Sequence, residues 1–324
     1  MADVSNEEAE DAMKQFAEIT GTDEIFAQTI LQDVNWKLEA ALEVFYGSGT
    51  ADPADVIQIT NGTRDSEVVE EKSDLTGLEI SLLSWNIDGL DGNSLATRML
   101  AVSKIVSRVN ADFVFLQEVV ERDLDKLMKL KKLYEVYFSN RDAQYYTAIL
   151  VSKVFTVTSH NVVHYSNSGM GRSLQIVEGK LGPLHIFLLN THLESTADHS
   201  DKRKKQLEEC LHKMNTLSND YPDALIFFGG DLNIRDREME SLPRGFADAW
   251  MAAGANKKNE FTWDTQKNKN KDVRYGVRCR FDRIFFKATP LAKVQFSLEG
   301  QQLIRTCLCY PSDHWAVHCV FSAS

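Results

Sequence analysis

The residues best suited to chemistry follow a short apolar run that ends near position 228. Residues 224–228 read as a buried strand, and Gly229 and Gly230 end it and allow the backbone to approach a ligand closely. Asp231 and Asn233 come next, two positions apart, so in an extended chain both side chains lie on one side. A carboxylate can orient or deprotonate a water, and an amide can hold a phosphate oxygen. The alternative is an Asx-rich turn after a strand.

Four further polar groups stand where predicted strands begin or end. In a mixed sheet the start of one strand can lie beside the end of an antiparallel neighbour, so all the groups can meet at one edge. Taken singly they also fit a turn, a surface acid, a packed histidine and a cap, but their shared position favours a common site. The groups are Asn86 with Asp88, Glu118, His192, and Asp313 with His314.

These residue types fit metal-assisted hydrolysis of a phosphodiester. Mg²⁺ prefers oxygen ligands, keeps several waters and takes one or two carboxylates. Glu118 and Asp88 are the first candidates for metal ligands, and Asp313 is a third. We therefore expect Mg²⁺ as the cofactor, with Mn²⁺ able to substitute for it.

We expect the five cysteines to be reduced thiols. Their number is odd and no signal peptide is recognisable, so a disulfide framework is not expected. Cys307 and Cys309 are separated by one residue, which is not the usual zinc spacing. No apolar run approaches the ~20 residues of a membrane span, and we expect a soluble intracellular protein.

The formal net charge of −11 is unusual for a protein that binds nucleic acid. It is unevenly distributed, because residues 1–77 hold 18 Asp and Glu against 4 Lys and Arg, a net charge of −14. The remaining chain holds 29 acids against 32 bases, a net charge of +3. The acidity therefore belongs to the N-terminal part, and the rest can meet a polyanion without net repulsion.

The order of elements from residue 78 predicts an α/β domain of about 247 residues. Amphipathic helices are expected at 95–109 and 207–217. Many strands with few helices favour two sheets covered by helices. Strands are expected at 79–85, 112–116, 148–151, 174–177, 184–189, 224–228, 282–286 and 315–321.

Residues 1–48 predict a small domain of three short helices. Trp36 marks the start of the third helix, with Asn35 as its N-cap. Residues 49–77 are rich in acids and glycine and show no sustained period, which predicts a disordered linker. All the candidate catalytic residues fall in the third segment, 78–324.

The polar groups resemble the motifs of the endonuclease/exonuclease/phosphatase superfamily, the relatives of DNase I and exonuclease III. The resemblance implies a four-layer α/β sandwich of two mixed sheets flanked by helices, and Mg²⁺-dependent phosphoester cleavage. It also implies that Asp282 orients His314, as a carboxylate orients an imidazole elsewhere. The motifs are Trp85-Asn86, Leu116-Gln117-Glu118, Thr191-His192, Gly230-Asp231-Leu232-Asn233 and Ser312-Asp313-His314.

Longer motifs at 85–90, 191–196, 230–236, 262–265 and 280–286 resemble the tyrosyl-DNA phosphodiesterase 2 family. This resemblance implies removal of a topoisomerase II tyrosine from DNA 5′ ends, leaving a 5′-phosphate. We assign Asp231 to the attacking water with help from Asn233, Asn86 and His192 to the phosphate oxygens, and His314 to the developing charge. The expected DNA contacts are Tyr145, Ser195, Thr196, Arg235, Trp263 and Arg280. For the two aromatic residues, Tyr145 and Trp263, core packing is the alternative.

Residues 1–48 resemble ubiquitin-associated domains, which implies ubiquitin as a partner; a helical appendage without ubiquitin affinity is the alternative. Two other functions stay open. One is a phosphatase or phosphodiesterase acting on a lipid or inositol phosphate, and the other is a ubiquitin-binding adaptor with an inactive nuclease fold. We expect a monomer in the nucleus, with the cytoplasm as a second location and no membrane association.

Overall fold

The computed structural model describes residues 78–239, 241–271, 273 and 276–323, together with residues 9, 12, 15, 16, 31, 36–38 and 41. The chain divides into two compact units, Met1–Ser73 and Asp74–Ser324. Among the described residues, no helix is long and apolar enough to cross a membrane.

The described residues of the first unit are mostly helical, and Phe16, Leu31 and Ala41 are fully buried. Trp36, which we expected inside the third helix, instead lies in a turn with a φ of 60°, and helical structure is present at Leu38. The expected N-cap at residue 35 and the linker at 49–77 lie outside the described residues.

The second unit contains two six-stranded mixed sheets and a small two-stranded one. The first sheet runs in the order β13 (Leu291–Glu299), β14 (Ala316–Ala323), β1 (Glu79–Asn86), β2 (Phe113–Val119), β4 (Tyr146–Ser152) and β3 (Tyr134–Phe138). The second runs in the order β5 (Phe155–His164), β6 (Ser173–Leu181), β7 (Leu184–His192), β8 (Leu225–Asp231), β12 (Asp282–Lys287) and β9 (Phe246–Asp248). The small sheet pairs β10 (Trp263–Asp264) with β11 (Arg278–Cys279).

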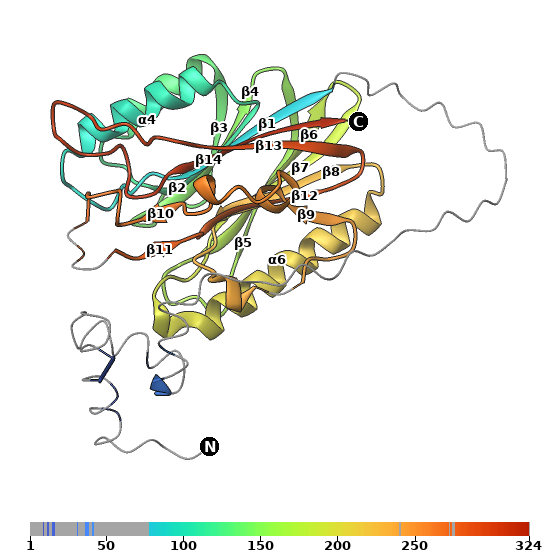
Figure 1. The fold of residues 1–324 in the computed structure, drawn as a ribbon. Helices are drawn as coiled ribbons and strands as arrows, with labels where there is room; N and C mark the ends of the chain where they lie inside the picture. The colour runs from blue at the N-terminus through green and yellow to red at the C-terminus, as the bar shows by residue number, and fades with distance from the viewer. Residues whose placement is uncertain are drawn as a thin grey trace. The chain divides into compact units, whose positions relative to one another are not determined.

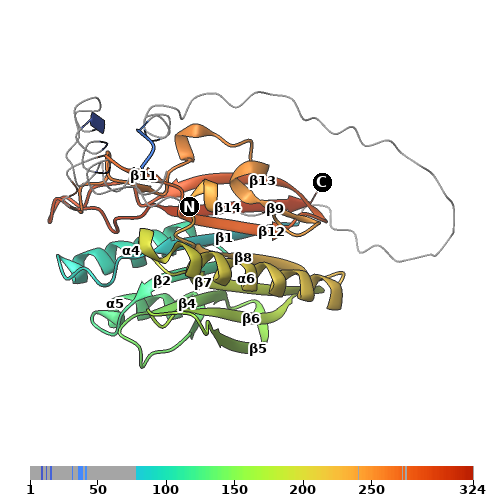
Figure 2. The same ribbon diagram turned by 90° about the horizontal axis from the view of Figure 1, so that it is seen from below.

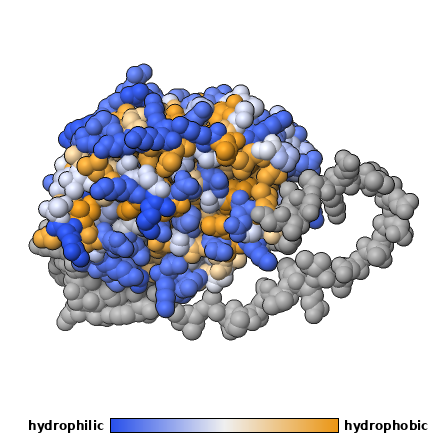
Figure 3. Space-filling model, turned by 90° about the horizontal axis from the view of Figure 1, so that it is seen from above, coloured by the Kyte–Doolittle hydropathy of each residue, from blue (hydrophilic) through white to orange (hydrophobic). Residues whose placement is uncertain are grey.

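The two large sheets pack face to face and a long helix covers the outer face of each, so the expected four-layer sandwich is confirmed (Figures 1 and 2). One core lies between the sheets, a second joins the first sheet to α4, and a third joins the second sheet to α6. The face in Figure 3 carries hydrophilic side chains over much of its area, as expected where most large hydrophobic residues are buried. The helices are α4 (Leu95–Val109), α5 (Leu124–Leu127), α6 (Ser200–Asp220) and α7 (Ala249–Ala252), with 3₁₀ turns η1 (Met128–Lys132), η2 (Ala197–His199), η3 (Asp236–Glu238) and η4 (Lys257–Asn259).

Strand direction brings the polar residues to one edge of the sandwich. β7 and β8 are parallel neighbours and pair His192 with Asp231, while antiparallel β12 pairs Asp282 with Asp231. In the first sheet, parallel β1 and β2 pair Asn86 with Gln117. The register of β2 against β4 then shifts, so Glu118 lies in a bulge with a φ of 56°. A bulge of this kind can re-aim a side chain beside an active site.

One expectation about the cysteines is wrong. Cys307 and Cys309 form a disulfide, whereas Cys210, Cys279 and Cys319 are free. The turn at Leu308, which has a φ of 52°, brings the two Cα atoms to 5.3 Å, within the range that a disulfide requires. The pairing could not be read from the spacing because it depends on this left-handed residue.

Candidate active site

Asn86 joins the two sheets at the polar edge. It is the last residue of β1, and its Nδ2 donates to Glu118 Oε1 at 3.2 Å and to Asp231 Oδ2 at 2.9 Å. Glu118 belongs to the first sheet and Asp231 to the second. Asn86 Oδ1 accepts the backbone N–H of Asp88 at 3.0 Å, which fixes the orientation of the amide. The side chain is 2% exposed, so these contacts replace water.

Asp231 ends β8 in a position that its neighbours determine. A Cβ added at Gly230, where φ is 133°, would meet the carbonyl oxygen of Thr191 at 1.9 Å, so glycine is required for β7 and β8 to approach there. Asp231 Oδ1 accepts the backbone N–H of Asn233 at 3.0 Å. Asn233 has a φ of 50°, so the chain turns instead of staying extended, and the Asn233 amide donates to the carbonyl of Leu193 at 3.3 Å. The Asx turn and the buried carboxylate therefore occur together.

Two histidines in opposite protonation states lie beside Asp231. His192 Nε2 and His314 Nε2 are 3.3 and 3.7 Å from Asp231 Oδ2. Burial and the charge of Arg172 lower the pKa of His192 to about 4, so its ring is neutral at neutral pH. Burial opposes protonation of His314 as well, but Asp282 at 2.8 Å and Asp231 raise the pKa of His314 well above its usual value. Burial favours a raised pKa for Asp231, yet the two imidazoles lower it below its usual range.

Three carboxylates form a separate group on the other side of Asn86. Burial, followed by the charges of Asp88 and Asp313, raises the pKa of Glu118 to about 7. Burial and Asp313 raise the pKa of Asp88 to about 6, although Lys271 and Arg98 oppose this. Nearby carboxylates thus disfavour the ionised forms of Glu118 and Asp88. A divalent cation removes that repulsion, and the donor set consists of the oxygens that Mg²⁺ prefers.

The residues therefore fit a divalent metal, and Asp88 Oδ2 supplies a further sign because it is buried without a hydrogen-bond partner. Among the described residues, the group whose ligand atoms all lie within 4.8 Å of one another is a different one, Asp231, Asp282 and His314. In that trio, however, His314 Nδ1 is already hydrogen-bonded to Asp282, and Asp231 is bonded to Asn86. These existing contacts leave Glu118, Asp88 and Asp313 as the better candidates for metal ligands.

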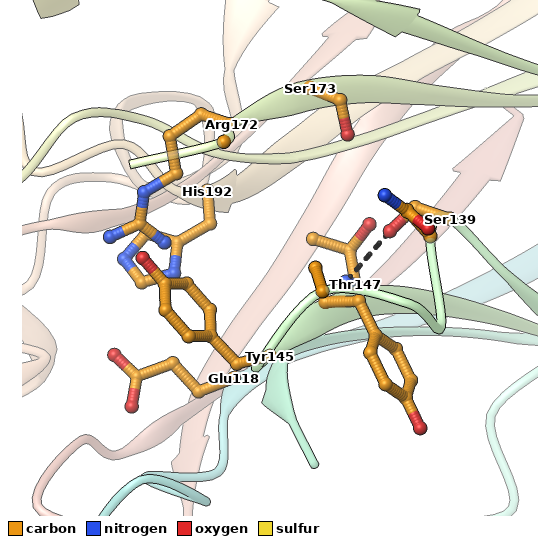
Figure 4. Close-up of a pocket in the computed structure, with 11 residues that line it drawn as sticks. Glu118, Ser139, Tyr145, Thr147, Arg172, Ser173 and His192 are labelled. Atoms are coloured by element: carbon orange, nitrogen blue, oxygen red, sulfur yellow. Dashed lines mark hydrogen bonds between the residues drawn. The ribbon is translucent and has the colours of Figure 1, made fainter. Parts of the chain in front are cut away.

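A solvent-open recess of about 320 Å³ adjoins these residues, and Glu118 and His192 form part of its lining. Glu118, Tyr145, Arg172 and His192 gather at one end of it (Figure 4). The guanidinium of Arg172 lies 4.8 Å from the centre of the Tyr145 ring, and Arg172 is 6% exposed. Arg172 Nε and Nη1 have no hydrogen-bond partner, and neither has His192 Nδ1. Buried donors without partners beside an opening are suited to an anion that enters from solvent.

Comparisons with known proteins agree with this geometry. Residues 83–314 match the endonuclease/exonuclease/phosphatase family, and residues 8–52 match the UBA-like domain family. A 5′-tyrosyl-DNA phosphodiesterase of Caenorhabditis briggsae is 53% identical over 100% of this chain and 93% of the relative. The crystal structure of TDP2 from C. elegans has a TM-score of 0.77 at 51% identity and covers 100% of this chain and 95% of that one. D. rerio TDP2 complexed with a single-strand DNA product has a TM-score of 0.71 at 34% identity and covers 76% and 99%.

The chain belongs to the tyrosyl-DNA phosphodiesterase 2 family. It is accordingly an enzyme, a hydrolase of phosphodiester bonds within the endonuclease/exonuclease/phosphatase group. Members of that group typically depend on divalent metals, which agrees with the acidic and histidine residues gathered here.

Some of the expected DNA contacts of this tyrosyl-DNA phosphodiesterase 2 family member lie beside the cluster. Trp263 pairs with His314 through a β-bridge, and its indole Nε1 donates to Asp313 Oδ2 at 3.1 Å. Ser195 Oγ lies 3.4 Å from Arg172 Nη2, at the recess. Thr196, the next residue, is exposed and has a φ of 70°.

The two expected arginine contacts are tied to acids. Arg235 Nη1 lies 3.7 Å from a Glu238 oxygen. Arg280 donates to Asp248 at 2.8 Å, its guanidinium lies over the Trp250 ring, and its side chain is only 8% exposed. The charge of Arg280 is therefore largely neutralised within the protein, and DNA contact by either arginine stays a prediction.

Sequence reasoning missed Arg172 and Lys271. A signal for Arg172 was present, because it stands two residues before the predicted strand at 174–177, just as His314 stands before the last strand. Lys271 lies in the connection between β10 and β11, and its Nζ is 2.8 Å from Asp88 Oδ1. No pattern in the sequence indicates that contact.

The raised pKa of Glu118 leads to a test by pH. A carboxyl whose folded-state pKa is raised contributes stability below its unfolded pKa, and that contribution is lost as pH rises through the folded pKa. For Glu118 the loss falls between pH 4.5 and about 7. Glu118→Gln keeps an acceptor for Asn86 without the charge. In metal-free solution we expect it to exceed the wild type in unfolding free energy by up to about 3 kcal/mol at pH 8, and by little below pH 4.5.

The measurement is urea unfolding in a chelator at several pH values, repeated with Mg²⁺. Added Mg²⁺ should stabilise the wild type more than Glu118→Gln, because an amide is the poorer ligand. Parallel pH profiles for the two metal-free proteins would show that Glu118 has no raised pKa.

Proposed function

We propose that this chain hydrolyses the phosphodiester bond between a topoisomerase II tyrosine and a DNA 5′ end, with Mg²⁺ as cofactor, and leaves a 5′-phosphate. The observation that carries the proposal is the recess beside Asn86. There, buried donors of Arg172 lack partners, and Arg172 lines the same recess as Glu118 and His192. That arrangement suits a phosphodiester, whose oxygens can accept from the donors. Relatives that share more than half of the sequence are named 5′-tyrosyl-DNA phosphodiesterases.

The proposed leaving group suits these side chains. A tyrosine phenolate has a reference pKa of ~10, so it departs far more readily than a sugar alkoxide. Arg172 supplies a fixed, nearly buried cation for the charge that develops. Tyr145 lines the same recess, and burial raises the pKa of its hydroxyl, so Tyr145 stays neutral beside the phosphate.

The two histidines have different tasks in the proposed reaction. His314 is held as an imidazolium by Asp282 and can stabilise negative charge on a phosphate oxygen. His192 is neutral with its N–H beside Asp231, and Asn86 donates to Glu118 and Asp231, so each reaches a phosphate oxygen by exchanging one of these contacts. Asp231 is ionised and can accept a hydrogen bond from the attacking water. Its lowered pKa makes it a weak base, so orientation of water is the larger part of its role.

Glu118, with Asp88 and Asp313, would hold the divalent ion, which when bound supplies positive charge for the phosphate oxygens. Trp263 donates to Asp313 and is partly exposed, so its ring could support a terminal base while it steadies this carboxylate. Ser195 accepts from Arg172, which lines the recess, and Thr196 follows it in the chain; both hydroxyls are suited to DNA phosphates.

The substrate is tested with a panel of phosphoesters on the full-length protein. We expect Mg²⁺-dependent, and Mn²⁺-dependent, release of tyrosine from a 5′-tyrosyl oligonucleotide, with much slower attack on the same oligonucleotide without tyrosine. Inositol phosphates should react slowly too, because their alkoxide is a poor leaving group. Preferred cleavage of an inositol phosphate, or no cleavage of any substrate with either metal, would contradict the proposal.

The role of Asp231 is tested by Asp231→Asn, which keeps the Asx turn to Asn233 and removes the charge. We expect kcat to fall about 10²–10⁴-fold in single-turnover cleavage, with DNA affinity unchanged or higher because a negative charge near the phosphate is gone. Asp201→Asn, on a carboxylate that is 91% exposed on α6, is the matched control and should leave the rate unchanged. Near-wild-type cleavage by Asp231→Asn, or recovery of the rate with more Mg²⁺, would refute this role.

We further propose a ubiquitin-binding domain at 1–48, a linker at 49–77, a monomeric catalytic domain at 78–324, and a nuclear location. The match of residues 8–52 to UBA-like domains supports the first of these. A protein truncated to 78–324 should cleave a short tyrosyl oligonucleotide at the full-length rate, because every proposed site residue lies within it. It should lose binding to immobilised ubiquitin, and equal ubiquitin binding by both proteins would contradict the assignment.

A further inference from the structure

A lysine lies against the proposed metal ligands. Lys271 Nζ is 2.8 Å from Asp88 Oδ1 and 3.0 Å from Asp91 Oδ2, so one ammonium joins two carboxylates. Asp88 is 4% exposed, and the side chain of Asp91 is 14% exposed. Two nearly buried carboxylates need a cation, and here the chain provides it.

The backbone holds Lys271 in this position. Asn268 Nδ2 donates to the carbonyl of Ser312 at 2.8 Å, and Asn270 exchanges two hydrogen bonds with the backbone of Tyr310. These contacts fix the loop directly before Lys271. The backbone at Lys271 is therefore ordered by the fold, and only the side chain has to be ordered against the two carboxylates.

The segment that carries Asp88 and Asp91 is also held in place. Arg98, which is 1% exposed, donates to the carbonyls of Asp88 and Asp91 at 3.0 and 2.6 Å. It also donates to the carbonyl of Pro311 at 3.3 Å. The guanidinium thus ties the segment after β1 to the segment that carries Asp313, and both carboxylates meet Lys271 in a set geometry.

Charge divides the acids into two sets. Asp88 and Asp91 face the two cations Lys271 and Arg98, with Arg98 Nη1 3.6 Å from Asp88 Oδ2. Glu118 has no ion-pair partner among the described residues. The uncompensated negative charge is therefore concentrated on the Glu118 side of Asp88.

We propose that Lys271 is a built-in cation that occupies the position of a second divalent ion between Asp88 and Asp91, so that the site takes up one divalent ion, on the Glu118 side. The inference rests on the metal site assigned under the proposed function. Lys271 acts through Asp88 and is a positioning residue, and it sets the number of ions that the site can hold.

The test counts bound Mn²⁺ in the full-length, metal-free protein by electron paramagnetic resonance of the free ion, without substrate. The wild type should bind one Mn²⁺ per chain at this site. Lys271→Met removes the charge and keeps the length of the side chain, and it should raise the number to two. Lys271→Arg should keep it at one.

Two further variants separate this role from a structural one. Lys267→Met, on an exposed lysine of the same loop that makes no side-chain contact among the described residues, should leave the count at one. Asp91→Asn added to Lys271→Met should return it to one, because the second site then lacks a carboxylate. Thermal unfolding of each variant establishes that it is folded.

The outcomes distinguish the two proposals. A Lys271→Met protein that binds one ion with unchanged affinity, or a wild type that already binds two, would overturn the role of Lys271 and leave the proposed function standing. A wild type that binds no Mn²⁺ would overturn the metal assignment and the role of Lys271 together.

Discussion

The active site depends on one side-chain amide that is shared between two sheets. Asn86 donates to Glu118 of the first sheet and to Asp231 of the second. Each acceptor belongs to a different chemical group: Glu118 to the carboxylates that suit a metal, and Asp231 to the pair of histidines. Other buried amides also cross between the sheets, such as Gln117 to Asn190 and Gln175 to the backbone of Tyr137. Asn86 is the one that contacts both groups, so its two hydrogen bonds fix the distance between Glu118 and Asp231. A small shift of one sheet would separate them.

The cost of this arrangement is visible in the charges that it buries. Glu118 and Asp88 have raised pKa values because burial and like charge oppose their ionisation. Between the sheets, by contrast, a large apolar core is packed beside buried amides that hydrogen-bond across the two sheets. Stability thus comes from the sandwich, while its polar edge is kept in an unfavourable electrostatic state that a divalent cation relieves. Without metal, the buried carboxylates at that edge are expected to lower the free energy of unfolding. With metal bound, their charges are compensated and the cost disappears.

The sequence allowed prediction of all eight interior strands and none of the four edge strands β3, β5, β9 and β13. Interior strands are buried on both faces and form continuous apolar runs, whereas β5 alternates between exposed and half-buried residues along most of its length. The site residues that flank interior strands were found for the same reason. Arg172 was missed although it directly precedes the interior strand β6, whereas Lys271 was missed because a loop delivers it. The Cys307–Cys309 pair was missed because it needs a left-handed Leu308.

The protonation states narrow the class of phosphoester that the proposed reaction suits. An alkoxide leaving group needs a proton from a well-matched acid, but His314 holds its proton tightly, since Asp282 and Asp231 raise its pKa far above neutrality. His192 is unprotonated at neutral pH, and Arg172 does not release a proton. Glu118 lines the recess with a pKa of about 7, but it would give up its proton on holding a divalent ion. With the ion bound, the recess would therefore offer fixed positive charge and hydrogen bonds but no ready acid. Such a site stabilises a departing phenolate without protonating it, and it favours an aryl phosphodiester over the ordinary backbone of DNA, which limits damage to the strand being repaired.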